Sequence, residues 1–287
     1  MAFKKLTDIW QLKLMANTLR QDLIRALLEA KSGHTAGPLD LAEFFTAMYF
    51  NFLDHDPKDP SWGSRDRFVL SCGHVCPVQY VAMANAGYFP KEELMTLRKL
   101  GTRLHGHPHN LSLPGIENSS GPLGQGTSQA VGKALALKME GKKQYVYCLT
   151  SDGEHNEGQP WEAWMFAAKY KLSNLIAFMD RNYIQIDGNT EDVMPLDPLE
   201  DKFKAFNVNV ISIDGNDLSQ IIGAVKAAKA SGKFTMILLN TVPGKGVSFM
   251  ESNYEWHGKP PNAQEADLAL KELQAERERL EKGAALP

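Results

Sequence analysis

The chain has 287 residues, of which 43% are hydrophobic and 23% are charged, and its formal net charge is −3. These values are typical of a folded protein with one large or two small domains, and they exclude disordered and fibrous classes. The net negative charge argues against a protein that binds nucleic acid or a membrane surface through overall positive charge.

The cysteines and the N-terminus indicate a cytoplasmic protein. Cys72, Cys76 and Cys148 are odd in number and lack the spacing of a disulfide framework, so reduced thiols are expected. A zinc site made of Cys72, Cys76, His74 and His107 is an alternative, although this spacing fits no common template. No run of eighteen apolar residues and no apolar leader is present, so neither a membrane span nor a targeting segment is expected.

Hydrophobic periodicity predicts the elements of the first half of the chain. Thr7 and Asp8 form a helix-capping pattern, and apolar residues then recur at helical spacing until Gly33. Helices are expected over residues 9–33, 40–53 and 78–89, a strand over 67–71, and a loop over 101–126. Gly87 is expected to end the third of these helices.

The second half alternates regularly between strand and helix patterns. Strands are expected over residues 144–150, 174–180, 206–214 and 234–240, and helices over 127–141, 160–172 and 217–231. Short apolar strands that alternate with helices predict an α/β fold with a doubly wound, mostly parallel sheet and helices on both faces.

The charged C-terminal segment predicts one more helix. Asn262 is a suitable N-cap, and the leucines that follow have heptad-like spacing, so a helix over residues 262–283 is expected to lean on another surface. We therefore expect a main domain over residues 1–250 and a C-terminal extension over residues 251–287.

Polar residues follow two of the predicted strands at the points where ligands bind in such sheets. Asp152 follows one strand, and Asn182 follows the next strand, thirty residues later. This distance accommodates one crossover helix, so the two side chains can converge at the same edge of the sheet. Their oxygen atoms suit magnesium or calcium, and the Gly153 amide can approach a phosphate. The pattern predicts a metal-bridged diphosphate site, although a Ser-Asp-Gly tripeptide alone is usually a helix-capping turn.

The segment from Asp152-Gly153 to Asn182 resembles the signature of enzymes that use thiamine diphosphate, with Ser151 in place of its first glycine. Four other regions resemble transketolase: SGHTAGPLD (32–40), DRFVLSCGH (66–74), GHP with GPLGQG (106–108 and 121–126), and EWHG (255–258). The resemblance covers almost the whole chain but only the N-terminal half of a full-length transketolase. The N-terminal subunits of split transketolases are still more similar.

The resemblance implies a thiamine-diphosphate-binding fold and a role for each matched residue. The metal ligands would be Asp152, Asn182 and the backbone carbonyl of Ile184, and the cation would be Mg²⁺. The residues that contact the cofactor would be His74, Gly121, Leu123, Gly153, Asn182, Ile186 and His257. The catalytic histidines would be His34, His107 and His257, since a neutral imidazole can accept and donate protons near neutral pH.

The resemblance also implies a partner chain. Glu157 and Glu162 are either ordinary acids near a helix N-terminus or, as the resemblance implies, part of a subunit interface. The domain that binds the aminopyrimidine ring of the cofactor is not in this chain. The resemblance therefore implies an obligate partner, the C-terminal transketolase subunit, with two copies of each chain.

The implied activity is the transfer of a two-carbon ketol unit from a ketose, such as a sugar phosphate, to an aldose acceptor. One alternative is the α chain of a 2-oxo-acid dehydrogenase, which would be expected to lack the GHP and EWHG motifs. Another is a non-catalytic paralogue that only binds the cofactor. The sequence leaves the identity of the sugars open.

Overall fold

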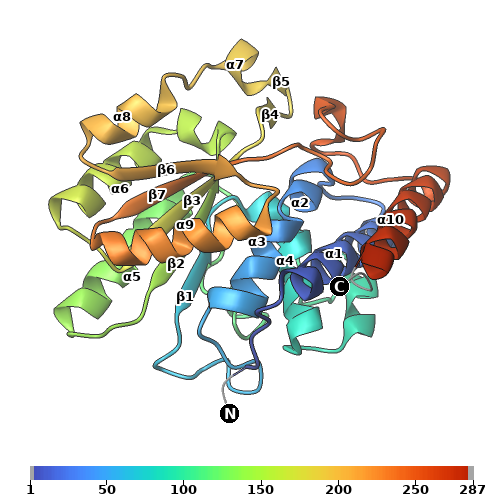
Figure 1. Ribbon diagram of the computed structural model, residues 1–287, viewed down its shortest axis with the longest axis horizontal. Helices are drawn as coiled ribbons and strands as arrows, with labels where there is room; N and C mark the ends of the chain where they lie inside the picture. The colour runs from blue at the N-terminus through green and yellow to red at the C-terminus, as the bar shows by residue number, and fades with distance from the viewer. Residues whose placement is uncertain (1–2, 284–287) are drawn as a thin grey trace.

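Five parallel strands form the central sheet, in the order β1-β2-β3-β7-β6 (Figure 1). The computed structural model describes residues 3–283. The strands are β1 Arg67–Leu70, β2 Val146–Ser151, β3 Leu175–Arg181, β6 Asn209–Asp214 and β7 Thr235–Asn240. Every pair of neighbouring strands is parallel. The predicted doubly wound α/β fold is therefore confirmed.

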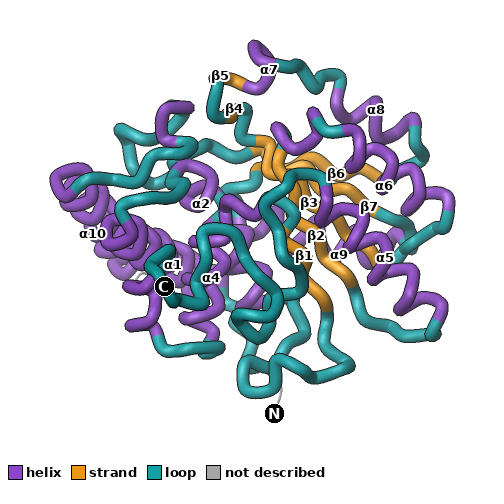
Figure 2. Tube along the Cα trace, turned by 180° about the vertical axis from the view of Figure 1, so that it is seen from behind, coloured by secondary structure: helices purple, strands orange, loops and turns teal. Residues whose placement is uncertain are grey.

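Helices cover both faces of the sheet (Figures 1 and 2). Successive side chains of a strand point to opposite faces, so Tyr147 and Leu149 join one core, while Val146 and Cys148 join the other. The first face carries α1 Ile9–Ala30, α3 Ala42–Ala47, α4 Cys76–Ala86 and α9 Leu218–Ser231. The second carries α5 Gln125–Met139, α6 Gly158–Lys169 and α8 Leu199–Ala205.

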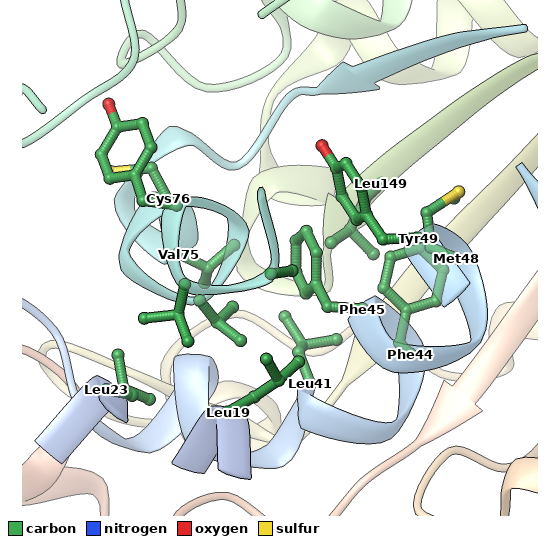
Figure 3. Close-up of a cluster of buried hydrophobic side chains, with 14 of the residues drawn as sticks. Leu19, Leu23, Leu41, Phe44, Phe45, Met48, Tyr49, Val75, Cys76 and Leu149 are labelled. Carbon is green, nitrogen blue, oxygen red and sulfur yellow. The ribbon is translucent and has the colours of Figure 1, made fainter. Parts of the chain in front are cut away.

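The helix predicted over residues 40–53 is wrong in its boundaries. The helical region begins earlier, with α2 Ala36–Asp40. It continues through α3 and ends in a π-helical turn over Met48–Phe52. Pro38 allows this early start because it lies in the first turn, where its missing N–H breaks no helical hydrogen bond. The aromatic residues of α3 and the π-helical turn contribute to the first core beside Leu19 of α1 and Leu149 of β2 (Figure 3).

Several other elements differ from the prediction. Helix α4 begins two residues before the predicted start, whereas its end is as predicted: Gly87 is the C-cap, with a φ of +97°. The region 101–124 contains neither helix nor strand, which confirms the predicted loop up to the start of α5. The short elements β4 Ile184–Gln185, β5 Gly188–Asn189, α7 Thr190–Val193 and α8 were not predicted, since most are too short to show a period.

The terminal helix α10, Ala263–Gly283, packs against α1 (Figure 1). Asn262 caps it by accepting hydrogen bonds from the backbone amides of Gln264 and Glu265, at 2.9 and 3.0 Å. Its buried residues belong to the same core as α1, so the segment beyond residue 250 shares that core. Within residues 3–283, no helix is long and apolar enough to cross a membrane.

The contact between α10 and α1 can be tested with two leucines of the same helix. Leu273 is fully buried and Leu268 is 53% exposed. We expect Leu273→Ala to lower the free energy of unfolding by about 2–5 kcal/mol, because it removes buried apolar atoms and leaves a cavity. Leu268→Ala should change it by less than about 0.5 kcal/mol. Urea unfolding measures both values, and equal effects would contradict the docking of this helix.

Candidate functional site

A cavity of about 310 Å³ lies at the carboxyl ends of β2 and β3. Its volume is that of a small-molecule site. It brings together eleven of the thirteen residues singled out in the sequence. These are His34, His74, His107, Gly121, Leu123, Asp152, Gly153, Asn182, Ile184, Ile186 and His257. The other two, Glu157 and Glu162, are exposed at the N-terminal end of α6.

Asp152 lies at this edge because β2 and β3 pair in parallel. Ser151 lies opposite Asp180, and the Asp152 amide donates to the Asp180 carbonyl at 3.0 Å. The Asp152 side chain is 1% exposed. Burial raises the pKa of this carboxyl group, whereas Arg181, the Tyr183 amide and the Gly153 amide lower it. The carboxyl group is thus desolvated and held by several donors.

The two oxygens of Asp152 have different surroundings. Oδ2 accepts hydrogen bonds from Arg181 Nη1 at 3.2 Å, the Tyr183 amide at 2.9 Å and Thr190 Oγ1 at 3.3 Å. Oδ1 accepts one from the Gly153 amide, at 2.6 Å. Three donors saturate Oδ2, so Oδ1 is the oxygen with capacity for a further partner.

Two buried carboxyl groups that the sequence analysis missed hold the Asn182 side chain. Asn182 Nδ2 donates to Asp180 Oδ2 at 2.7 Å and to Asp40 Oδ2 at 3.2 Å. Burial raises the pKa of both acids well above the usual range, and neighbouring carboxylates add to the effect. These contacts identify which atom of the Asn182 side-chain amide is the nitrogen, because it must donate to the two acids. The oxygen is left for other partners, one of which is the Ile184 amide at 3.2 Å.

Three histidines from distant parts of the chain meet in the cavity. The ring centroids of His34, His74 and His257 lie 5.0 to 5.5 Å apart. Thr35 Oγ1 donates to the Lys259 carbonyl at 2.6 Å and so ties the loop of His34 to that of His257.

The histidines of the cavity are neutral at pH 7. Burial lowers the pKa of His34 and of His257 to about 4, and the neighbouring histidines add to the effect at His34. The pKa of His74 is well below its usual range for the same two reasons. The Nδ1 atoms of His34 and His257 are buried and have no hydrogen-bond partner among residues 3–283.

The loop 120–124 forms another wall of the cavity. Gly73, which precedes His74, is required by a close approach: a Cβ there would lie 2.5 Å from Ser120 Oγ and 3.0 Å from the Gly121 amide. A Cβ at Gly121 would lie 3.6 Å from the His107 ring, so this ring lies against the loop. Burial and Arg98 lower the pKa of His107.

Glu154 fixes the same loop, and the sequence analysis did not single it out. Its fully buried carboxyl group accepts hydrogen bonds from the Gly124 amide at 2.6 Å, from the Ser71 hydroxyl, and from the Ser151 amide at 3.3 Å. Burial raises its pKa to about 7, against the effect of these donors. An acidic residue two positions after Asp152 was the only signal in the sequence, and it was indistinguishable from a capping acid.

These residues fit a divalent cation and a diphosphate. Asp152 Oδ1, Asn182 Oδ1 and a nearby carbonyl are hard oxygen donors, and magnesium typically takes one or two carboxylates plus substrate phosphates. The imidazole N–H groups are donors for phosphate oxygens, and the Gly153 N–H, which donates to Asp152 Oδ1 in this structure, would have to leave that oxygen to reach a phosphate. A Cβ at Gly153 would lie 3.2 Å from Gln185 Oε1, so the absence of a side chain keeps that approach open.

The alternative zinc site is wrong. Cys72 Sγ lies 3.7 Å from the Leu149 carbonyl and Cys76 Sγ lies 3.3 Å from the Gly106 carbonyl, so each thiol is a buried donor to the backbone. Burial raises the pKa of both thiols, which disfavours thiolate ligands. Across residues 3–283, no group of three or more His, Cys, Asp or Glu side chains could hold a metal ion.

The histidine cluster predicts acid sensitivity of the ligand-free chain. A pKa of about 4 for His257 lies below the value of about 6.5 in the unfolded chain, so the unfolded state binds more protons between these limits. Stability should therefore fall as the pH is lowered from about 6.5 towards 4. His257→Asn should reduce this slope by up to about 1.4 kcal/mol per pH unit. Urea unfolding across this range measures it, and an unchanged slope would contradict the neutral histidine.

Glu154 should have the opposite dependence on pH. Its pKa is raised in the folded state, so its contribution to stability is complete below about pH 4.5 and is lost as the pH rises towards 7. Glu154→Gln keeps an acceptor but cannot ionise. The variant should gain stability relative to the wild type between these limits, by up to about 3 kcal/mol. Parallel stability curves of the two ligand-free proteins would disprove this.

Comparison with known proteins identifies the family. Residues 11–280 match the family model described as transketolase, thiamine diphosphate binding domain. The 6-deoxy-6-sulfo-D-fructose transketolase subunit of a Clostridium species is 45% identical over 91% of this chain and 95% of its own length. An apulose-4-phosphate transketolase subunit from Actinobacillus succinogenes is 40% identical over 93% of this chain and 97% of its own length.

Solved transketolase structures agree with these matches. The transketolase of Campylobacter jejuni superposes with a TM-score of 0.84 at 31% identity, and a variant from Pichia stipitis with 0.85 at 30%. Each match covers 96% of this chain but only 48% and 46%, respectively, of the solved chain, so this chain spans just under half their length. The chain belongs to the transketolase family and corresponds to its thiamine-diphosphate-binding domain, which in its close relatives is a separate subunit.

Proposed function

We propose that this chain is the thiamine-diphosphate- and magnesium-binding subunit of a two-chain transketolase, which transfers a two-carbon ketol unit from a ketose to an aldose. One observation carries the proposal: the side chains of Asp152 and Asn182 line the same cavity as a cluster of neutral histidines. A diphosphate bound through a metal ion requires oxygen ligands for the cation and hydrogen-bond donors for the phosphate oxygens.

In this proposal the chain holds the cofactor through its diphosphate. Asp152, Asn182 and the Ile184 carbonyl would bind Mg²⁺, while His74 and His257 would donate to phosphate oxygens, together with the Gly153 amide once it leaves Asp152 Oδ1. Leu123 and Ile186 are 36% and 68% exposed, and they provide apolar surface for the rings together with the backbone of Gly121.

When bound, thiamine diphosphate supplies an electron sink for the two-carbon unit. The protein supplies proton transfer and orientation. A neutral imidazole has one N–H donor and one acceptor nitrogen, so His34, His107 and His257 can both hold sugar hydroxyl groups and transfer their protons. The lowered pKa values keep these rings neutral at pH 7, in the form that serves both roles.

The proposal includes a partner, a C-terminal subunit that carries the pyrimidine-binding domain, with two copies of each chain. Two features support it: relatives of the same length are named as subunits, and the solved transketolases are twice as long. Glu157 and Glu162 are exposed at the N-terminal end of α6 and would lie at a subunit interface of that assembly. The three cysteines are free and buried, which suits a cytoplasmic location.

The relatives also guide the choice of substrate. Their names specify 6-deoxy-6-sulfo-D-fructose and apulose-4-phosphate, two ketoses that carry a terminal anionic group. We therefore propose a ketose phosphate or sulfonate as the donor, with the residues that recognise the anion supplied mainly by the partner.

The test is ketol transfer by the purified chain with and without its partner, in the presence of thiamine diphosphate and Mg²⁺. Activity should require both proteins and disappear on addition of EDTA. Asp152→Asn should lower kcat/KM about 100-fold or more, because it removes a charged metal ligand. The same change at the exposed residue Asp267 is the control. Full turnover by the chain alone would refute the two-chain proposal, and no turnover by the pair with any ketose phosphate or sulfonate would refute the activity.

A further inference from the structure

Arg181 is a buried cation beside the candidate metal ligand. Its side chain is 2% exposed at the end of β3, and its guanidinium group lies 4.0 Å from the centroid of the Tyr183 ring. Nη1 donates to Asp152 Oδ2 at 3.2 Å. Nη2 donates to Glu191 Oε1 and, at 3.4 Å, to Asp197 Oδ1. One guanidinium group thus bridges a carboxylate at the strand end and two carboxylates of the following segment.

The segment Tyr183–Asp197 depends on these contacts for its position. Glu191 accepts hydrogen bonds from the amides of Leu196, at 3.1 Å, and Asp197, at 3.4 Å. Thr190 donates through Oγ1 to Asp152 and through its amide to the Tyr183 carbonyl, at 2.8 Å. The segment includes β4 and β5, and β4 contains Ile184, the proposed carbonyl ligand.

We propose that Arg181 is a positioning residue that fastens the segment Tyr183–Asp197 to Asp152 and directs Asp152 Oδ1 towards the cation. This inference rests on the proposed function for the identity of the cation. The three donors on Oδ2 fix the rotation of the carboxylate, so Oδ1 is the oxygen presented to a metal. Fastening the segment also places the Ile184 carbonyl, so one residue positions two of the three ligands.

The shape of the guanidinium group explains why arginine suits this position. Its planar fork reaches carboxylates on two sides at once, whereas the ammonium group of lysine is a single point charge. If Arg181 has a positioning role, its removal should weaken metal binding. If only its charge mattered, removal should strengthen metal binding, because a cation beside a ligand repels the metal. Removal of Arg181 therefore distinguishes a positioning role from an electrostatic one.

The experiment measures two properties of the full-length chain in Arg181→Gln, Arg181→Lys and Glu191→Gln. The first is hydrogen exchange of the amides in residues 183–197 without ligands. The second is the affinity for Mn²⁺, by titration calorimetry, with thiamine diphosphate and the partner subunit present. Arg277→Gln is the matched control, since Arg277 is a partly buried arginine that pairs with Glu281 of α10 and donates to Thr18 of α1, and these hydrogen bonds and ion pairs involve none of residues 183–197. Glu191→Gln removes the charge of the partly exposed partner of Arg181 and so weakens the attachment of the segment, but it leaves the buried pair of Arg181 and Asp152 in place.

For Arg181→Gln we expect exchange in residues 183–197 to be about 10-fold faster and Mn²⁺ binding about 10-fold weaker, as for other residues that orient metal ligands. Arg181→Lys should lie between this variant and the wild type, Glu191→Gln should accelerate exchange, and Arg277→Gln should change neither property. Unchanged exchange, or Mn²⁺ binding that is equal or tighter in Arg181→Gln, would overturn the inference. Failure of the wild type to bind Mn²⁺ would overturn the proposed function, and exchange would still decide whether Arg181 fastens the segment.

Discussion

The site depends on the burial of carboxyl groups at one edge of a parallel sheet. Asp40, Asp152 and Asp180 are each at most 1% exposed, and burial raises the pKa of all three. A buried anion is costly unless a cation or several donors compensate it. Arg181 and backbone amides provide part of this compensation at Asp152. An additional divalent cation would complete it, which gives a physical reason for a metal site at this edge.

The convergence of Asp152 and Asn182 at one edge of the sheet could be predicted because it follows from topology. Parallel pairing places the ends of β2 and β3 side by side, and a crossover helix fixes the spacing of Asp152 and Asn182 in the sequence. The strands were also predictable, since each is short and rich in apolar residues, and all but the partly exposed strand β6 are largely buried. The hairpin of β4 and β5 was not predictable, because two-residue strands have no detectable period. The start of the helix predicted over residues 40–53 was placed too late, because Pro38 reads as a residue outside a helix although it lies in the first turn of α2.

The residues that hold the ligands in position could not be predicted. Asp40 reaches Asn182 from 142 residues away, and Glu154 joins Ser71 to the loop at Gly124. Such contacts depend on strand register and side-chain rotamers, which a single sequence does not reveal. Arg181 directly precedes Asn182 in the sequence, but its role was not evident there. Its contacts with both Asp152 and Glu191 exist only when the segment around Glu191 lies against the end of β3. Ligands can be inferred from strand ends, whereas their supports require the folded chain.

The cavity has walls of different character. The histidine rings and the strand-end oxygens line it with polar and largely buried groups, whereas Leu123 and Ile186 line it with side chains that are 36% and 68% exposed. Exposed apolar side chains beside a polar pocket are typical of a surface that another molecule covers. The chain also aligns with less than half of each solved transketolase. Both facts fit the proposal of a site that this chain forms only in part, and completion of such a site by a partner subunit would couple cofactor binding to the association of the two proteins.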